Sequence, residues 1–143
     1  MTIAPPALRQ ATCVAIGGRG LLIEGLPGAG KSSLALALID RGAILVGDDG
    51  VALSPHEGRL LASPAPATRG LLEVRGVGLI TLPVAQDVPV ALVIRLDPAA
   101  PRFAEEAAAE TICGVPVPAI ALWPESPVLA LRAEAALHRY GAV

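Results

Sequence analysis

The sequence predicts a mixed α/β domain, and three observations lead to this fold class. Apolar residues make up 53% of the 143 residues and charged residues 17%, the balance of a folded chain rather than a disordered one. Short apolar runs separated by glycine-containing turns predict strands joined as hairpins, and two longer segments have the ends and the apolar content of helices. The length suits a single domain over residues 1–143.

The N-terminal half combines two hairpins with one buried helix. The runs "ATCVAI" (11–16) and "LLIE" (21–24) flank a glycine-rich turn and predict the first hairpin. The segment "SSLALALIDRG" (32–42) is apolar almost all round, as in a helix packed against a sheet, and its final glycine predicts its end. "AILVG" (43–47) predicts a buried strand, and "VALSPHEGRLLA" (51–62) predicts a second hairpin.

The C-terminal half adds two strands and a closing helix. "VPVALVIRL" (88–96) predicts a strong strand, and "VPAIAL" (117–122) another, which its prolines place at a sheet edge or strand start. "ESPVLALRAEAALHRYG" (125–141) predicts a helix capped by Ser126, with Pro127 in its first position. The total is about seven strands and two long helices, and the hairpins favour a mixed sheet over a purely parallel one.

Composition and charge exclude several function classes. The net charge is −2, with no basic stripe and no aromatic platform, so the sequence predicts no nucleic-acid partner. The longest uncharged run, 111–124, is shorter than the roughly 20 apolar residues of a membrane span, and no signal peptide is expected. The two lone cysteines, Cys13 and Cys113, predict buried thiols in a reducing cytoplasm.

One motif carries most of the chemistry. Residues 25–33, "GLPGAGKSS", include the only lysine of the chain and match G-x-x-x-x-G-K-[ST] at every position. In this motif backbone N–H groups surround a phosphate, and the following helix directs the positive end of its dipole at the anion. A chance match in a glycine-rich chain is the alternative, but strand, loop, helix and the single lysine coincide here. The predicted nucleotide-binding residues are Gly25, Leu26, Pro27, Gly28, Ala29, Gly30, Lys31, Ser32 and Ser33.

Acidic residues could complete a phosphate-transfer site. Asp48 and Asp49 follow the strand 43–47, and ligands gather at such strand ends. Phosphoryl transfer needs a metal ligand and a group that positions or deprotonates the acceptor. Two acids before a glycine also form an ordinary turn, so spacing alone leaves both interpretations open. Glu73 and Arg75, in "LLEVRGVGLI" (71–80), are further candidates, with a surface ion pair as their alternative.

Three blocks of sequence carry a resemblance to a known family. They are "LLIEGLPGAGKSSLALALIDRGAILVGDDGV" (21–51), "GLLEVRGVGLI" (70–80) and "VPVPAI" (115–120), in that order. The chain resembles the C-terminal catalytic domain of HPr kinase/phosphorylase, in the short form without the N-terminal domain. The resemblance implies a P-loop kinase core with a mixed β-sheet, related to phosphoenolpyruvate carboxykinase.

The resemblance also implies roles for the residues of the motif blocks. ATP would lie against residues 25–33, with Mg²⁺ held by Ser32 and Glu73. Asp48 would be the base that takes the proton from the acceptor serine of HPr, and the acid of the reverse phosphorolysis. Asp49 would support it.

The chain departs from the family pattern at two positions and again after "VPVPAI", where it is shorter than the long enzymes and does not show their basic Gly-Arg-Asn stretch. Gln10 stands where the family has a histidine, and glutamine carries no titratable proton near neutral pH, which leaves phosphorolysis open. Arg102, followed by Phe103, is the nearest match to the family's Arg-Leu-Gly, and Arg102 and Lys31 complete the implied catalytic set.

The implied partner is HPr or an HPr-like carrier, in the regulation of phosphotransferase-linked carbon metabolism. The implied location is the cytoplasm, and a homo-oligomer is left open. Two other functions stay open beside this one. The first is a nucleotide-binding regulator with the kinase fold and little catalysis, which Gln10 favours. The second is a small-molecule kinase that uses the same core.

Overall fold

Eleven strands, two α-helices and one short 3-10 helix make up residues 6–142, the part of the chain that the computed structural model describes. The strands are β1 (Ala7–Arg9), β2 (Thr12–Ile16), β3 (Arg19–Gly25), β4 (Ile44–Gly47), β5 (Val51–His56), β6 (Arg59–Pro64), β7 (Leu71–Val74), β8 (Gly78–Thr81), β9 (Val88–Leu96), β10 (Ala108–Ile112) and β11 (Val115–Leu122). The helices are α1 (Lys31–Asp40), η1 (Pro66–Thr68) and α2 (Leu129–Tyr140).

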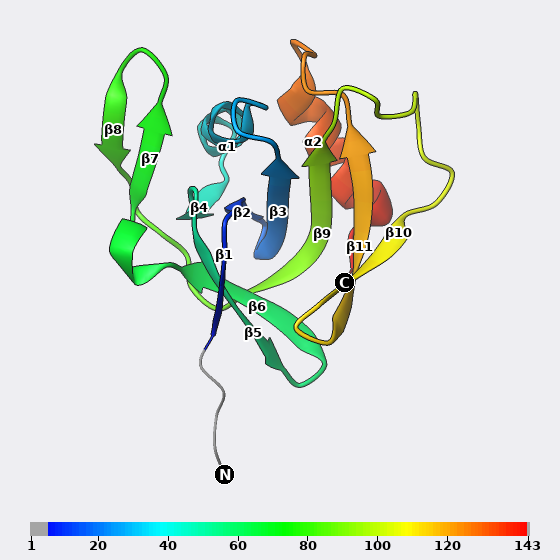
Figure 1. Ribbon diagram of the computed structural model, residues 1–143, viewed down its shortest axis with the longest axis horizontal. Coiled ribbons are helices and arrows are strands. Elements are labelled where there is room, and N and C mark those ends of the chain that lie inside the picture. Colours follow the sequence, from blue (N-terminus) through cyan, green and yellow to red (C-terminus); the bar gives the residue numbers. More distant parts are fainter. Residues whose placement is uncertain (1–5, 143) are drawn as a thin grey trace.

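Nine of the strands form one curled sheet, drawn in Figure 1 with α1 and α2 beside its upper part. The strand order is β1-β5-β6-β9-β3-β2-β4, and β11 also pairs with β9, with β10 beyond it. The start of β9 pairs with β6 and its end with β11, so the sheet branches along this strand. β9 is parallel to β3 and β11 while its pairing with β6 is antiparallel, which confirms the predicted mixed sheet.

The central strands are buried on both faces. Leu21 and Ile23 of β3 pack toward the two helices, together with Leu38 of α1 and Leu137 of α2. Leu22, between them on the strand, packs into a second cluster inside the curl of the sheet. Burial on both faces explains why these strands read as continuous apolar runs rather than as alternating patterns.

The sheet holds more strands than the sequence pattern indicates. The predicted seven are present, but the pattern missed β1, β7, β8 and β10. β1 has only three residues, and β10 has the sequence "AAETI", in which alanine and glutamate are poor strand formers. β7 and β8 pair only with each other and stand apart from the main sheet beside α1 (Figure 1).

The predicted helix ends are right in one case and wrong in another. Gly42 adopts a left-handed φ of 110° one residue beyond Arg41, the C-cap of α1, as the predicted stop requires. α2 begins at Leu129, so placing Pro127 in the first helical position was wrong. The Ser126 hydroxyl accepts the backbone N–H of Val128 at 3.1 Å, which makes a turn before the helix instead of a cap on it.

Of two further expectations, the placement of the β11 prolines is confirmed and the burial of both cysteines is wrong in part. Pro116 and Pro118 lie in the first half of β11, which confirms the predicted strand start; this half pairs with β10, and β9 pairs with β11 only from Ala119 onward. Cys13 is fully buried, and burial raises the pKa of its thiol to about 12. Cys113, however, is exposed because it sits in the tight β10–β11 turn with a φ of 52°. None of the helices in residues 6–142 is long and apolar enough to cross a membrane.

Candidate active site

The glycine-rich loop connects the end of β3 to the first turn of α1. Gly28 and Gly30 have φ values of 84° and 100°, a left-handed conformation that other residues adopt at a cost. α1 begins at Lys31 with no side-chain cap and no acidic residue in its first turn. The N–H groups of that turn have no partner within the helix, so they and the helix dipole fit an anionic group placed against the loop.

Lys31 spans the loop that precedes it. Its ammonium group donates hydrogen bonds to the carbonyl oxygens of Gly25, at 2.9 Å, and Leu26, at 3.2 Å. A compact ammonium on a flexible stem can hold these two carbonyls and still turn toward a phosphate, which the planar guanidinium of arginine would do less well. This geometry gives a reason for the single lysine in a chain that otherwise uses arginine.

Asp48 is the centre of the hydrogen-bonding at the site. Its Oδ1 accepts the hydroxyl of Ser32 at 2.7 Å and the hydroxyl of Thr12 at 3.0 Å, and its Oδ2 accepts the backbone N–H of Glu73 at 3.1 Å. The side chain is almost wholly buried. The carboxylate of Asp48, which follows β4, is therefore hydrogen-bonded to α1, β2 and β7.

Sequence reasoning missed Thr12. It is a fully buried polar residue that begins the apolar strand β2. Its hydroxyl donates to Asp48 and so belongs to the site. A lone threonine at the start of an apolar run, opposite the predicted P-loop strand, was the available signal.

Asp49 points away from this buried centre. It is exposed, has a left-handed φ of 56°, and its Oδ1 accepts a hydrogen bond from the side-chain amide of Gln10 at 3.2 Å. The left-handed backbone at Asp49 turns the two adjacent carboxylates to different surroundings. Gln10, singled out from the sequence as a departure from the family, is thus placed at the acidic pair.

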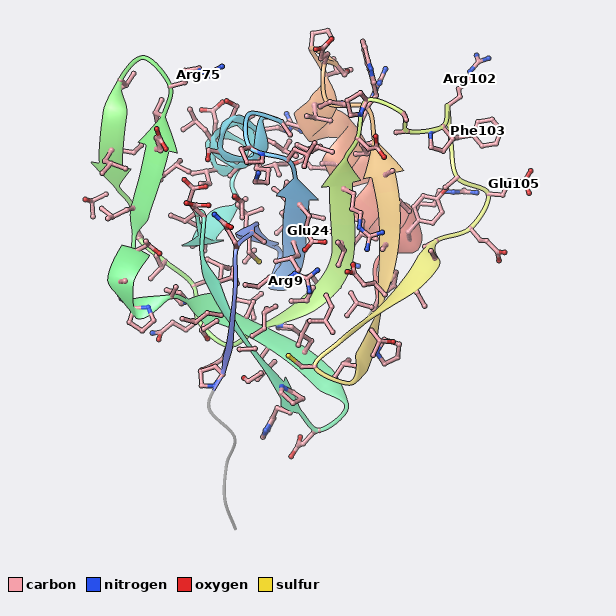
Figure 2. All side chains as sticks on the ribbon, viewed as in Figure 1. Arg9, Glu24, Arg75, Arg102, Phe103 and Glu105 are labelled. Carbon is pink, nitrogen blue, oxygen red and sulfur yellow. The ribbon has the colours of Figure 1, made fainter. Side chains whose placement is uncertain are left out.

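A cleft of about 640 Å³ brings these groups together. Its walls are the loop and first turn of α1, the two aspartates and the β7–β8 hairpin, including Glu73 and Arg75. Figure 2 shows Arg75 extending from the tip of the hairpin on the side that faces α1. Glu73 is exposed to the cleft, although its backbone is tied to Asp48.

The oxygen ligands needed for Mg²⁺ are present in this cleft. Ser32, Asp48 and Glu73 all line it, and hydroxyl and carboxylate oxygens are the ligands that Mg²⁺ prefers. Residues 6–142 contain no group of three His, Cys, Asp or Glu side chains that could hold a metal by themselves. This donor set fits the usual Mg²⁺ site, in which one or two carboxylates are supplemented by phosphate oxygens and water.

One predicted catalytic residue lies elsewhere. Arg102 and Phe103 are exposed in the loop between β9 and β10, on the far side of α2 from the β7–β8 hairpin (Figure 2). Arg102 lines a separate cleft with Trp123 and Tyr140. The fold therefore does not bring Arg102 to the loop within one chain, and its catalytic role stays a prediction.

The fold and this cleft define a P-loop α/β domain with a kinase-type site. The sequence profile described as the HPr Serine kinase C-terminal domain matches residues 1–127. The chain therefore belongs to the family of HPr serine kinase C-terminal domains, and the resemblance inferred from the three sequence blocks is confirmed.

Relatives and a solved structure agree with this assignment. HPr kinase/phosphorylase from Clostridium tetani is 46% identical over 81 residues, which are 57% of this chain and 27% of the relative. HPr kinase/phosphorylase from Clostridium novyi is 40% identical over 102 residues, 66% of this chain and 33% of the relative. The structure of the Hpr(Ser) kinase/phosphatase from Coxiella burnetii superposes with a TM-score of 0.82 at 31% identity, covering 92% of this chain and 88% of that one. The matches span about a third or less of the length of these curated relatives.

Proposed function

We propose that this chain is an ATP- and Mg²⁺-dependent protein-serine kinase whose acceptor is HPr or an HPr-like carrier. The observation that carries the proposal is the position of Asp48, which accepts a hydrogen bond from Ser32 of the P-loop within the cleft that also holds Glu73. Membership of the family, and relatives named HPr kinase/phosphorylase, support this substrate class. An ATP-using kinase of this kind would act in the cytoplasm.

In this proposal the loop and helix residues bind the nucleotide. The N–H groups at residues 28–33 and the ammonium of Lys31 hold the phosphates, exchanging the loop carbonyls of Gly25 and Leu26 for phosphate oxygens. Ser32 and Glu73 would hold Mg²⁺, which neutralises charge on the phosphates when bound. The β7–β8 hairpin forms the opposite wall of the cleft.

Asp48 acts as the general base. It takes the hydroxyl proton of the acceptor serine as the serine oxygen bonds to the γ-phosphorus and the bond from that phosphorus to ADP breaks. In the reverse direction, with inorganic phosphate attacking phosphoserine, the protonated Asp48 returns the proton to the serine oxygen. Thr12 and the N–H of Glu73 hold the carboxylate in place for both directions.

One observation favours a second function, a nucleotide-binding regulator with little catalysis. Gln10 donates a hydrogen bond to Asp49 but can neither accept nor release a proton near neutral pH. If turnover depends on a titratable side chain at position 10, the chain would bind nucleotide without transferring its phosphoryl group to an acceptor.

Phosphate transfer to a carrier protein decides between the two functions. The purified chain is mixed with Mg²⁺, γ-labelled ATP and HPr-like proteins of the host, and the phosphorylated residue is mapped. The kinase function predicts phosphoserine on the carrier and its loss in Lys31→Ala, with an unchanged circular dichroism spectrum. Nucleotide binding without transfer would support the regulator, and turnover that ignores any carrier would indicate a small-molecule kinase.

A further inference from the structure

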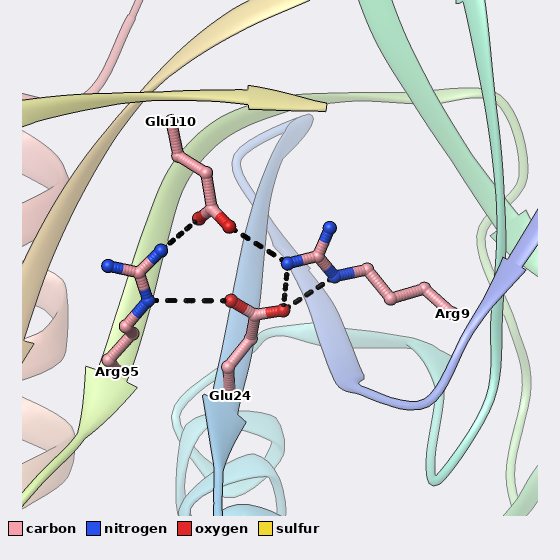
Figure 3. A network of polar contacts seen from close by, with 4 residues as sticks. All are labelled: Arg9, Glu24, Arg95 and Glu110. Carbon is pink, nitrogen blue, oxygen red and sulfur yellow. Dashed lines mark hydrogen bonds and ion pairs between the residues drawn. The ribbon is translucent and has the colours of Figure 1, made fainter. Parts of the chain in front are cut away.

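Four charged residues form an ion network beside the phosphate-binding strand but outside the cleft (Figure 3). Arg9 ends β1, Glu24 lies near the end of β3, Arg95 is on β9 and Glu110 is on β10. Arg9 donates to Glu24 from Nε at 2.5 Å and to Glu110 from Nη2 at 2.9 Å. Arg95 Nη2 lies 2.8 Å from Glu110, and Arg95 Nε lies 3.8 Å from Glu24. Each carboxylate therefore has both guanidinium groups as neighbours.

The two carboxylates of the ion network depend on these partners because they are largely shielded from water. Their side chains are 17% exposed in Glu24 and 19% exposed in Glu110. Oε2 of Glu110 is buried and receives no aligned hydrogen bond, so the nearby charge of Arg95 alone compensates it. Burial lowers the pKa of Arg9, but Glu24 and Glu110 together raise it above its ordinary value. Removing one member leaves a partly buried charge without its partner, which is costly.

The ion network joins two strands that the backbone leaves apart. β1 is hydrogen-bonded only to β5, at one end of the sheet, and β10 only to β11, at the end of the branch. The bond from Arg9 to Glu110 links these edges across 101 positions of the chain. The strand ladder pairs Arg9, the last residue of β1, with Val51 of β5, and the side-chain bonds of Arg9 add a link from this strand end to the centre of the sheet.

Arg9 and Glu24 are each followed in the chain by a residue that is hydrogen-bonded to a residue lining the active-site cleft. Gln10 follows Arg9 and donates to Asp49 at 3.2 Å. Gly25 follows Glu24, and its carbonyl oxygen accepts from Lys31 at 2.9 Å. Arg9 is the last residue of β1 and Gln10 lies in the bend that follows it, and their side chains reach the ion network and Asp49 respectively.

We propose that Arg9 is a positioning residue: the ion network anchors the end of β1 so that Gln10 holds Asp49 at the mouth of the cleft. Arg9 acts through Gln10 and touches neither nucleotide nor acceptor. The kinetic consequence rests on the proposed kinase function, but the structural link from Glu110 to Gln10 does not. An ion network that only stabilised the fold would change the free energy of unfolding without any specific effect on Gln10 or Asp49.

Glu110→Gln is the test variant, because it removes one charge of the ion network without touching the cleft. Glu134→Gln is the matched control: Glu134 pairs with Arg41 at 2.7 Å, at the opposite end of α1 from the phosphate loop. Nuclear magnetic resonance then follows the side-chain amide of Gln10 and the backbone amide of Asp49. Glu110→Gln should shift both signals, and Glu134→Gln should shift neither.

Kinetics in two backgrounds provide the second readout. Glu110→Gln should lower the kcat of phosphate transfer by about 2- to 30-fold, the usual range for residues that act through a neighbour, with little change in the KM for Mg-ATP. In a Gln10→Ala background the same substitution should have no further effect, because its route to Asp49 is already broken. Glu134→Gln should leave transfer unchanged in both backgrounds.

Either of two results would overturn the proposal: unmoved Gln10 and Asp49 signals in Glu110→Gln, or an equal loss of transfer with and without Gln10. If Glu110→Gln does not fold, Arg95→Gln replaces it, since Arg95 is half exposed and its loss removes the second guanidinium that holds the two carboxylates bonded to Arg9. Smaller shifts of the same two signals are then expected, and their absence contradicts the proposal. If the parent chain transfers no phosphate, the proposed function fails, while the resonance comparison still decides this inference.

Discussion

Asp48→Asn separates the chemical role of Asp48 from its structural one. The substitution keeps the size of the side chain and removes its charge and its capacity to accept a proton. With its oxygen toward the N–H of Glu73, the new amide can donate to the oxygens of Ser32 and Thr12, whose hydroxyls are free to rotate. All three contacts of Asp48 can therefore be replaced, and the fold should be retained.

The expected size of the effect follows from these contacts. General base catalysis contributes about 10²–10⁴-fold to rate, so transfer to the acceptor serine should fall by that factor, about 2.7–5.5 kcal/mol of barrier. Mg-ATP should bind as tightly as before or more tightly, because a negative charge beside the phosphates is removed. Asp48→Ala would in addition leave the fully buried Thr12 hydroxyl without an acceptor, at a cost of about 1–3 kcal/mol of stability.

The assay combines single-turnover transfer from labelled ATP with calorimetric titration of Mg-ATP and denaturant unfolding of the same samples. Asp49→Asn is the comparison variant, since Asp49 is exposed and is bonded to Gln10 instead of the P-loop serine. Equal transfer by the parent and Asp48→Asn would refute the assignment of the base, and Asp49 would then be the next candidate. Loss of binding together with transfer would show that Asp48 acts in nucleotide binding instead.

Four further predictions concern the cleft and the two cysteines. Glu73→Gln should weaken Mg-ATP binding in titrations more than metal-free ATP binding, and an equal loss in both would make Glu73 a structural residue. Gln10→His should raise forward or reverse transfer at neutral pH if a titratable group at this position limits turnover; unchanged rates in both directions would argue against that. Iodoacetamide at pH 8 should label Cys113 and spare Cys13 in the folded protein, as mass mapping would show. The raised pKa of Cys13 also predicts that the free energy of unfolding falls as the pH rises from 9.0 toward about 12, because only the unfolded thiol ionises there. A Cys13→Ala variant should show a smaller fall over this range, and an unchanged slope would contradict the prediction.

Much of the candidate phosphate-binding site could be predicted from sequence because it is contiguous. Residues 25–33 carry the glycines, the lysine and the hydroxyl within one loop and one helical turn, and this loop lies between β3 and α1 at the cleft. Asp48 was found because it directly follows a buried strand. Thr12 and the bond from Gln10 to Asp49 were not found, since each depends on which strand lies beside which.

The ion network shows most clearly what only the tertiary structure decided. Arg9, Glu24, Arg95 and Glu110 show no pattern in the sequence, and Arg9 and Glu110 meet beside Glu24 and Arg95, which lie opposite each other where β3 and β9 pair in parallel. Arg102 is the converse case: its place in the sequence suggested the site, and the path of the chain takes it to another cleft. Local patterns report the period of an element and the conformations that its residues allow, so the sequence alone determined seven of the eleven strands, the presence of both α-helices and the P-loop, but not β1, β7, β8 and β10. Pairing between distant segments depends on how all of the apolar faces are buried together. The tertiary structure therefore decided the strand register, the hydrogen bonds that converge on Asp48 and the ion network that links β1 to β10.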